Sequence, residues 1–341
     1  MQYTREFVHG TCGDDVRAFQ ENLLVLGYKL PQWGADGCYG GETEAAARNW
    51  CHDGQWDHCW DACPVWVQEK VEASSEPPGE TSWMPLGKGM FIQSFNSIDG
   101  PEEVEAVVRE VGIKWVCIQA LWQFVDKPSK TYNWPEDFGL KQSYGCSEKA
   151  RQCVDKFHEL GVVVLPFAYP VPGKEDECVQ ILEEYAEEWD SPSVVIDPEA
   201  PYKSDTGEFK AAALLLSAKM DASFDSWGMT TFGATWFHPD FPYQEFNKAT
   251  YGMGQTYTKY WLLNDRMARS HKEWRAFGFR NLVTLYGTYS ITASELSSLL
   301  QLVESMKTPA TAGWKWGSTS EIEWDLIEGM IDWDEEVAQH L

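Results

Sequence analysis

The sequence lacks several features that would place it in a familiar class. It has no apolar run near the roughly 18 residues that a membrane-spanning helix needs. Basic residues are scarce, because 27 Lys and Arg stand against 53 Asp and Glu, a formal net charge of −26. Nucleic acids are bound through basic patches, so this balance argues against a nucleic-acid partner. The opening residues MQYTREFVHG contain no apolar core of a secretory signal, so we expect no secretory targeting.

Motifs for metals and cofactors are also missing. There is no H-E-x-x-H, and the nine cysteines form no C-x2-C knuckle. One mixed cluster has the spacing C-x7-C-x3-C with two histidines, at Cys51, His52, His58, Cys59 and Cys63. We interpret its members as buried or surface thiols, and without a secretory signal we expect reduced cysteines. The sequence therefore predicts no metal and no cofactor, and the odd number of cysteines leaves at least one unpaired within the chain.

Aromatic residues are abundant. They make up 14% of the chain, with 18 Trp among them. Flat aromatic faces on an acidic protein suit neutral sugar rings, but a large aromatic core would give the same count, so both interpretations stay open.

A Ser-, Pro- and Gly-rich stretch divides the chain. Residues 74–88, SSEPPGETSWMPLGK, favour neither helix nor paired strand and are interpreted as a linker. The sequence therefore predicts a small domain over residues 1–73 and a larger one over residues 89–341, consistent with the length of 341 residues.

The first domain has two helical segments. Apolar residues recur with helical spacing up to Gly27-Tyr28, at Val16, Phe19, Leu23, Leu24 and Leu26. A turn with three glycines then leads into a second helix over 44–50. The layout D-V-x-x-F-Q-x-x-L-x-x-L-G-Y, a loop, and D-G-x-Y-G-x-x-T-x-x-A-x-x-x-W resembles the peptidoglycan-binding module of cell-wall hydrolases. The resemblance implies a three-helix bundle, with Tyr39 and Trp33 as candidate wall contacts or, alternatively, as residues that merely hold the bundle.

The second domain alternates between strand-like and helix-like segments. Eight β-rich runs are predicted, at 90–95, 114–119, 162–168, 194–197, 230–236, 252–257, 281–286 and 312–316. Helix boundaries lie between them, including Pro101, Gly112, Gly161 and the capping boxes Thr292-x-x-Glu295 and Ser318-x-x-Glu321. Eight strands alternating with helices over about 250 residues predict an α/β fold of the (β/α)8 TIM-barrel type. A doubly wound sheet is the alternative, but the first strand is followed by no Gly-rich phosphate loop.

The fourth predicted strand runs directly into two acids. The segment is Val194-Val195-Ile196-Asp197-Pro198-Glu199. Residues two apart in an extended chain point to the same face, and active sites of barrels lie at the carboxyl ends of strands. Two close carboxylates resist simultaneous ionisation, and a carboxyl with a raised pKa can protonate a glycosidic oxygen. We therefore predict Glu199 and Asp197 as catalytic, against the alternative of an acidic surface loop.

This placement resembles glycoside hydrolase family 25, the wall muramidases, whose barrels carry D-x-E at the end of strand four. It is also similar to family 18, whose longer D-x-x-D-x-D-x-E motif survives here only as Asp197 and Glu199, with Pro192 and Val195 at the earlier positions. The resemblance implies Glu199 as acid/base, with Asp197 assisting the N-acetyl group of the substrate. Family 25 has a further Asp at the end of strand one, where this sequence offers Gln93, Ser94 and Asn96.

Other strand ends supply candidate sugar contacts. The predicted substrate-binding residues are Asn96, Gln119, Trp122, Tyr169, Tyr202, Trp236, Asp240, Gln255, Tyr257, Tyr286 and Trp316. Asp240 is also a candidate additional carboxylate. For Trp314 and Trp316 we expect either that one of them faces outward into the helix layer or that both lie past the end of the last strand.

Together these observations predict a modular peptidoglycan hydrolase, acting as an N-acetylmuramidase. The absent secretory signal fits a bacteriophage endolysin, made in the host cytoplasm and acting on the bacterial wall after release. We expect a monomer whose partner is peptidoglycan, with no membrane span. Two alternatives stay open: a wall-binding protein without catalysis, and a hydrolase of another N-acetylated glycan such as chitin.

Overall fold

The computed structural model describes residues 3–26, 28–53, 62–65, 67–69, 71, 83–95, 98–125, 138–142, 148–203, 207–257, 265–289 and 291–330. The chain divides into two compact units. The first comprises Met1–Glu80 together with Arg269–Arg280, and the second comprises Thr81–Ala268 and Asn281–Leu341. The helix-containing segment 269–280 was not anticipated as part of the first unit.

The first unit contains the predicted helical segments. They are α1 (Asp14–Val25) and α2 (Gly41–Asp53), with further helical residues at 65, 67–69 and 71. A short antiparallel ladder between β1 (Phe7–Val8) and β2 (Ala62–Cys63) was not predicted. The apolar face of α1 is buried, with Val16, Phe19 and Leu23 fully inside. Leu24 was wrongly included in that face, because it is 42% exposed and lies one residue off the helical repeat.

The second unit is a barrel of parallel strands. The strands are β3 (Gly87–Ile92), β4 (Trp115–Val125), β6 (Val163–Ala168), β7 (Val194–Ile196), β8 (Trp227–Phe232), β9 (Tyr251–Gln255), β10 (Asn281–Leu282), β11 (Thr284–Gly287) and β12 (Ala310–Trp314). They follow the order β10-β9-β8-β7-β6-β4-β3-β12-β11, and each neighbouring pair is parallel. In the described chain, β3 begins at Gly87, two residues before the predicted start of this domain.

The ring of strands closes through one interrupted strand. β10 pairs with β9, and β11 pairs with β12, although only Val283 separates β10 from β11 in the sequence. The amide of Val283 donates to the carbonyl of Gly252 at 3.0 Å, which carries the ladder across the break. Residues 281–287 therefore join the two ends of the sheet, and the predicted (β/α)8 barrel is confirmed.

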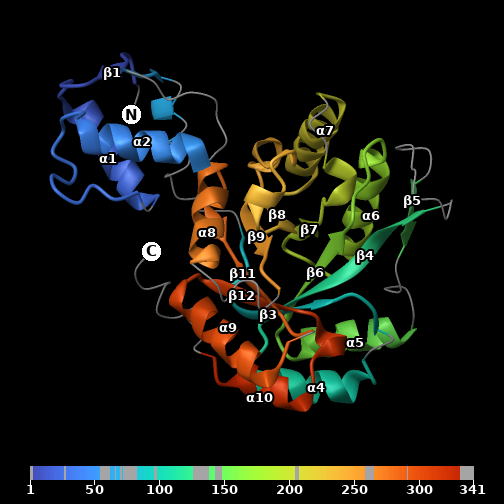
Figure 1. Ribbon diagram of the computed structural model, residues 1–341. Helices are drawn as coiled ribbons and strands as arrows, with labels where there is room; N and C mark the ends of the chain where they lie inside the picture. The colour runs from blue at the N-terminus through green and yellow to red at the C-terminus, as the bar shows by residue number, and fades with distance from the viewer. Residues whose placement is uncertain are drawn as a thin grey trace. The chain divides into compact units, whose positions relative to one another are not determined.

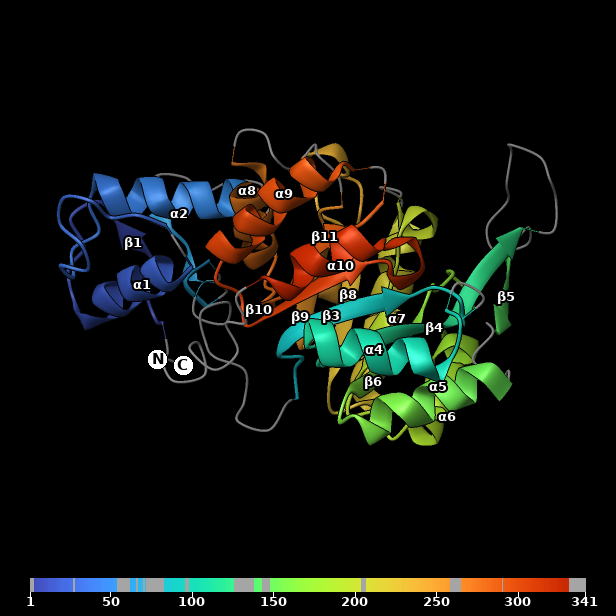
Figure 2. The same cartoon turned by 90° about the horizontal axis from the view of Figure 1, so that it is seen from below.

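Helices lie outside the strands (Figures 1 and 2). In chain order they are α4 (Pro101–Val111), α5 (Glu148–Glu159), α6 (Glu175–Glu188), α7 (Gly207–Ser223), α9 (Ala293–Ser305) and α10 (Glu321–Glu328). A further helix, α8 (Arg266–Ala276), lies mostly in the segment that belongs to the first unit. Two 3-10 turns, η4 (Thr235–Phe237) and η5 (Gln244–Phe246), connect β8 to β9. β4 extends beyond the ring and pairs antiparallel with β5 (Phe138–Gln142), which the sequence did not indicate.

Helix boundaries show where local signals were sufficient. Gly112 ends α4 in the left-handed conformation at φ 76°, and Thr292 with Glu295 forms the predicted capping box of α9. The capping box of α10 uses Ser320 and Glu323, so its predicted position two residues earlier is wrong. Ser318 does not cap α10, because it is the last residue of the 3-10 turn η7 (Trp316–Ser318), which precedes the helix.

Alternation along the strands sorts side chains into two layers. One buried cluster fills the barrel interior and includes Phe91, Trp115, Phe167, Val195 and Leu285. A second buried cluster lies between the strands and the helices. It contains the strand residues that alternate with those of the interior, such as Met90, Val116 and Val164. Gly89 and Gly228 make room for the interior rings, because an added Cβ would overlap the rings of Trp115 and Tyr251 respectively. The large aromatic content therefore partly builds this core.

The cysteines differ from the expected reduced state. Cys12 and Cys38 form a disulfide, and Cys51 is disulfide-bonded as well. Four others, Cys63, Cys117, Cys153 and Cys178, are free and buried. The expectation of reduced cysteines was wrong for these residues, because it was inferred from the missing secretory signal and not from the distances between sulfur atoms. The two sulfur atoms of Cys12 and Cys38 are brought together by backbone pairing between their loops.

Candidate active site

The acid pair lies at the carboxyl end of β7. The strand ends at Ile196, and the amide of Asp197 still donates to the carbonyl of Ala168 on β6 at 2.7 Å. The hydroxyl of Thr231 on β8 donates to the carbonyl of Pro198 at 2.5 Å, which holds the chain between the two acids. Asp197 is 5% exposed and Glu199 is half-buried. The more accessible carboxylate is thus Glu199.

A single amide joins the two carboxylates. Nε2 of Gln255, at the end of β9, donates to Oδ1 of Asp197 at 3.0 Å and to Oε1 of Glu199 at 2.8 Å. The amide group carries two N–H bonds, so it can serve both oxygens at once. Gln255 therefore positions the two acids relative to each other.

The second oxygen of Glu199 has its own donor. The hydroxyl of Tyr169, which follows β6, donates to Oε2 of Glu199 at 2.9 Å. Glu199 is thus held on both oxygens by residues from two different strand ends. Burial raises the pKa of the Tyr169 hydroxyl, and the negative charges of Glu199 and Asp197 raise it further, so this tyrosine stays protonated and remains a donor.

The two acids are electrostatically coupled. The pKa of Asp197 lies well above its ordinary value, chiefly because the carboxyl is buried and secondly because Glu199 is a nearby negative charge. The hydrogen bond from Gln255 opposes this shift. A buried carboxyl beside a second one favours the neutral form. The pair therefore tends to hold one proton between its two carboxyl groups.

Aromatic rings line the interior beside the acids. Trp314 at the end of β12 stacks on Tyr257 with ring centroids 5.7 Å apart and planes at 21°. It also contacts Phe91 and Phe167 at 5.5 Å and 6.2 Å. Burial raises the pKa of Tyr257, and the negative charges of Asp197 and Glu199 raise it further. An apolar ring face next to a proton donor is suited to a sugar ring.

Several predicted residues are brought together here. Tyr169, Gln255 and Tyr257 surround Asp197 and Glu199, as described above. Gln119 is buried on β4, in register with Phe167. Trp236 is half-buried on η4, 6.0 Å from the ring of Phe237, and Asp240 is exposed beyond that turn. Asn96 and the side chain of Trp122 lie outside the described residues.

Three predicted sugar contacts are wrong, because their rings are buried elsewhere. Tyr202 is fully buried on η3 (Ala200–Tyr202), 5.6 Å from Phe246. Tyr286 lies in the layer between strands and helices. Trp316 packs on Phe157 at 5.7 Å in the same layer, and its indole donates to Glu103 at 2.8 Å.

Tyr289 was missed as a residue of the site, although alternation could have found it, and the choice between Trp314 and Trp316 was left open. Val283 and Leu285 face the interior, so Tyr286 faces outward. Tyr289 is on the interior side, where its ring centroid lies 6.2 Å from that of Tyr257. Burial and the charge of Glu199 raise the pKa of Tyr289. On the last strand the interior position belongs to Trp314 and not to Trp316, which follows after the strand has ended.

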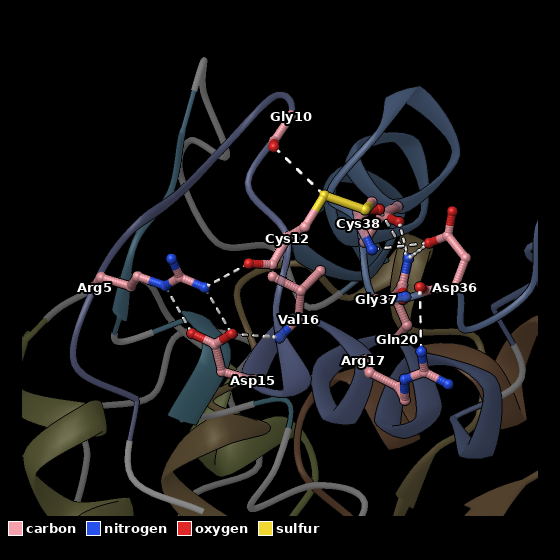
Figure 3. The surroundings of a disulfide bond; sticks show 11 residues. Arg5, Gly10, Cys12, Asp15, Val16, Arg17, Gln20, Asp36, Gly37 and Cys38 are labelled. Atoms are coloured by element: carbon pink, nitrogen blue, oxygen red, sulfur yellow. Dashed lines mark hydrogen bonds and ion pairs between the residues drawn. A yellow bond between two sulfur atoms is a disulfide. The ribbon is translucent and has the colours of Figure 1, made fainter.

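The motif residues of the first unit form one hydrogen-bond network. Nε2 of Gln20 donates to Asp36, to the carbonyl of Cys38 and to Thr43, while its Oε1 accepts from the amide of Gly37. Figure 3 shows Gln20 and Arg17 reaching toward this turn, beside the disulfide. The turn requires glycine at position 37, because Gly37 has a left-handed φ of 82°. This network shapes the turn, so these motif residues have a structural role.

The two candidate wall contacts differ sharply. Tyr39 is 2% exposed and packs 6.0 Å from Phe7, so its prediction as a surface contact is wrong. Trp33 is 66% exposed. The backbone amides of Gln32 and Trp33 donate to the carboxylate of Glu42 at 2.7 and 3.1 Å, which fixes this loop against α2.

The described residues contain neither a membrane-spanning helix nor a cluster of metal ligands. No described helix is long and apolar enough to cross a membrane. No group of three or more His, Cys, Asp or Glu residues in the described part of the chain could hold a metal ion. Two members of the candidate cluster around Cys51 and Cys63, His58 and Cys59, lie outside the described residues.

Comparison with known proteins supports the fold. No protein-family model and no curated sequence matches the chain. Solved structures do. A class V chitinase from Pseudomonas fluorescens Pf-5 has a TM-score of 0.53 at 9% identity, covering 72% of this chain and 99% of its own. A class V chitinase from Nicotiana tobaccum has a TM-score of 0.53 at 7% identity, covering 73% and 100%.

A chitinase from Chromobacterium violaceum ATCC 12472 is also similar, with a TM-score of 0.50 at 10% identity, covering 72% of this chain and 98% of its own. At such low identities the similarity shows the fold. The second unit is thus a (β/α)8 barrel of the kind that these chitinases share.

Proposed function

We propose that the protein is a glycoside hydrolase that cleaves the glycan strand of peptidoglycan as an N-acetylmuramidase. The observation that carries the proposal is the carboxylate pair Asp197–Glu199 at the carboxyl ends of the barrel strands, joined by Gln255 at 2.8–3.0 Å. Similarity to chitinases of the same fold supports glycoside hydrolysis, since fold and site agree. The peptidoglycan specificity rests on the D-x-E motif and the N-terminal module.

Each acid has a distinct task in this mechanism. Glu199 is the more accessible carboxyl and donates a proton to the glycosidic oxygen, then accepts one from water. Asp197, buried beside it, orients the N-acetyl group of the sugar, whose carbonyl oxygen attacks the anomeric carbon. Trp314 provides the ring face on which that sugar rests. Tyr169 and Gln255 hold Glu199 in place.

The first unit supplies attachment to the wall. Trp33 is its large exposed aromatic ring, fixed by Glu42, and it provides a flat face for a sugar or stem peptide. A tethered binding module raises the concentration of the enzyme at an insoluble polymer. We also propose that the protein acts as a monomer, and that it is an endolysin that reaches the wall from inside the cell.

The deciding experiment is product analysis on purified sacculi. Wild-type protein should lower turbidity and release muramic-acid reducing ends, while Glu199→Gln should bind sacculi and release none. Binding without reducing ends from the wild type would support a non-catalytic wall-binding protein. Chitin is the second candidate substrate, favoured by the structural similarity to chitinases, and release of N-acetylglucosamine oligomers from chitin alone would establish it.

A further inference from the structure

A lysine stands at the mouth of the barrel. Lys315 directly follows β12, and its Nζ donates to Oε1 of Gln93 at 2.5 Å. Gln93 directly follows β3, whose Phe91 pairs with Trp314 in the ladder. The lysine thus bridges the carboxyl ends of two adjacent strands, at the edge of the barrel where the acid pair also lies.

The lysine and the acids occupy opposite arcs of the ring. In the strand order β7-β6-β4-β3-β12, four steps separate the acid strand from the lysine strand. The ring of Trp314, the residue before Lys315, lies in the barrel interior and stacks on Tyr257. A sugar that rests on Trp314 is therefore next to Lys315, and the acid strand β7 lies across the ring of strands from it.

The positive charge of Lys315 is not neutralised by a described neighbour. None of the ion pairs among described residues includes it, and its hydrogen-bond partner Gln93 is a neutral amide. Both oxygens of the nearby Glu103 accept from other groups, the indole of Trp316 and the amide of Asp99. The ammonium group thus retains its capacity for an anionic ligand.

The backbone of Lys315 is well fixed. Its carbonyl accepts hydrogen bonds from the hydroxyls of Thr288, Ser318 and Thr319 at 3.0–3.2 Å. Its side chain is half-buried, whereas Gln93 is exposed. The ammonium group is therefore held at the edge of the site, where a ligand can replace or join Gln93.

We propose that Lys315, with Gln93, forms a carboxylate subsite that makes the enzyme prefer glycans bearing carboxylates over neutral glycans. This inference rests on the proposed glycosidase function. A chain of net charge −26 repels anionic polymers, so a local cation at the site offsets that repulsion for a correctly placed carboxylate. In peptidoglycan this group is either the lactyl carboxylate of a muramic acid without its peptide or a carboxylate of the stem peptide.

The test compares matched substrates. Glycan strands stripped of stem peptides carry free lactyl carboxylates, and converting these to methylamides removes the charge while leaving every glycosidic bond. Full-length wild type should cleave the carboxylate form with a kcat/KM about 10- to 100-fold above that for the amide form, the value expected for one charge-assisted hydrogen bond. Lys315→Gln should abolish this preference, and Lys315→Arg should retain most of it. Lys114→Gln, at the opposite end of the barrel, is the matched control and should keep the preference.

The arms also identify the source of the carboxylate. A further outcome is that wild type cleaves intact sacculi faster than the methylamide strands but cleaves the two stripped strand forms at equal rates. If Lys315→Gln removes that difference, the stem peptide supplies the carboxylate. A preference that survives in Lys315→Gln, or the same rate for all substrates in wild type, would overturn the inference. If wild type releases no reducing ends from any glycan, the proposed function fails. Binding of the two strand forms to wild type and Lys315→Gln then still decides whether the subsite exists.

Discussion

The carboxylates of Asp197 and Glu199 accept hydrogen bonds from the same nitrogen atom, Nε2 of Gln255, at 3.0 and 2.8 Å. Two acids that would otherwise repel each other are thereby held side by side in a largely buried place. The donor comes from another strand, more than fifty residues further along the chain. This relationship is the centre of the site, and it makes the first prediction direct.

Replacing the shared donor should disable the acid pair. Gln255→Leu keeps the approximate size of the side chain but removes both hydrogen bonds. We expect kcat to fall about 10- to 100-fold, because each lost bond was made to an ionisable group. The measurement is the initial rate of reducing-end release from sacculi. Gln244→Leu, on η5, is the matched control, and an equal loss in both variants would argue against the bridging role.

Removing the donor to the other oxygen of Glu199 should affect catalysis more than binding. Tyr169→Phe deletes one hydroxyl and leaves the ring in place. We expect kcat to fall roughly tenfold, with KM nearly unchanged, because the hydroxyl orients the acid and not the sugar. Steady-state kinetics on soluble glycan strands would check this. A rise in KM at constant kcat would instead place Tyr169 against the substrate, as first predicted from sequence.

The buried position of Asp197 should make stability depend on pH. Its pKa in the folded protein lies well above the value in the unfolded chain, which is about 3.9. Between these two values the folded state binds more protons, so the free energy of unfolding falls as pH rises. Asp197→Asn cannot ionise and should avoid that loss.

Thermal unfolding measured between pH 4 and 8 tests this expectation. The melting temperature of Asp197→Asn should exceed that of wild type by a few degrees near neutral pH, and the gap should shrink toward acid pH. The same variant should lose glycosidase activity. A gap that stays constant, or reverses, across this range would show that the charge of Asp197 does not oppose folding.

The two tryptophans after the last strand should separate binding from stability. Trp314→Phe replaces the indole in the barrel interior by a smaller phenyl ring. We expect KM to rise about tenfold, because stacking area with the sugar is lost. Trp316→Phe removes a hydrogen bond to Glu103 in the helix layer and should lower the melting temperature while leaving KM near that of wild type. The reverse pattern would restore Trp316 as the sugar contact.

Wall attachment should depend on the exposed aromatic ring of the first unit. Trp33→Ala should reduce co-sedimentation with sacculi several-fold without changing the melting temperature, because the ring is 66% exposed. Tyr39→Phe is the matched aromatic control and should bind as wild type does, since its ring is buried. Unchanged pelleting of Trp33→Ala would move the wall contact to another surface.

Local sequence patterns were enough to predict the barrel and the acids. Eight strand-like runs alternate with capped helices, and an apolar strand that runs into Asp197 and Glu199 carries its own orientation, because residues two apart share a face. These signals depend on neighbours in the chain. They survive even where the strand itself is short, as in β7.

Tertiary structure decided everything that depends on parity or on distant partners. Whether Tyr286 or Tyr289, and Trp314 or Trp316, faces the acids depends on where each strand starts and ends, which composition does not reveal. The disulfide between Cys12 and Cys38 depends on loops 26 residues apart meeting across a turn. The sequence by itself determined which residues could do chemistry. Only the folded sheet brought Gln255 and Tyr169 to the acids, because the parallel order β6-β7-β8-β9 places the carboxyl ends of these strands at the same edge.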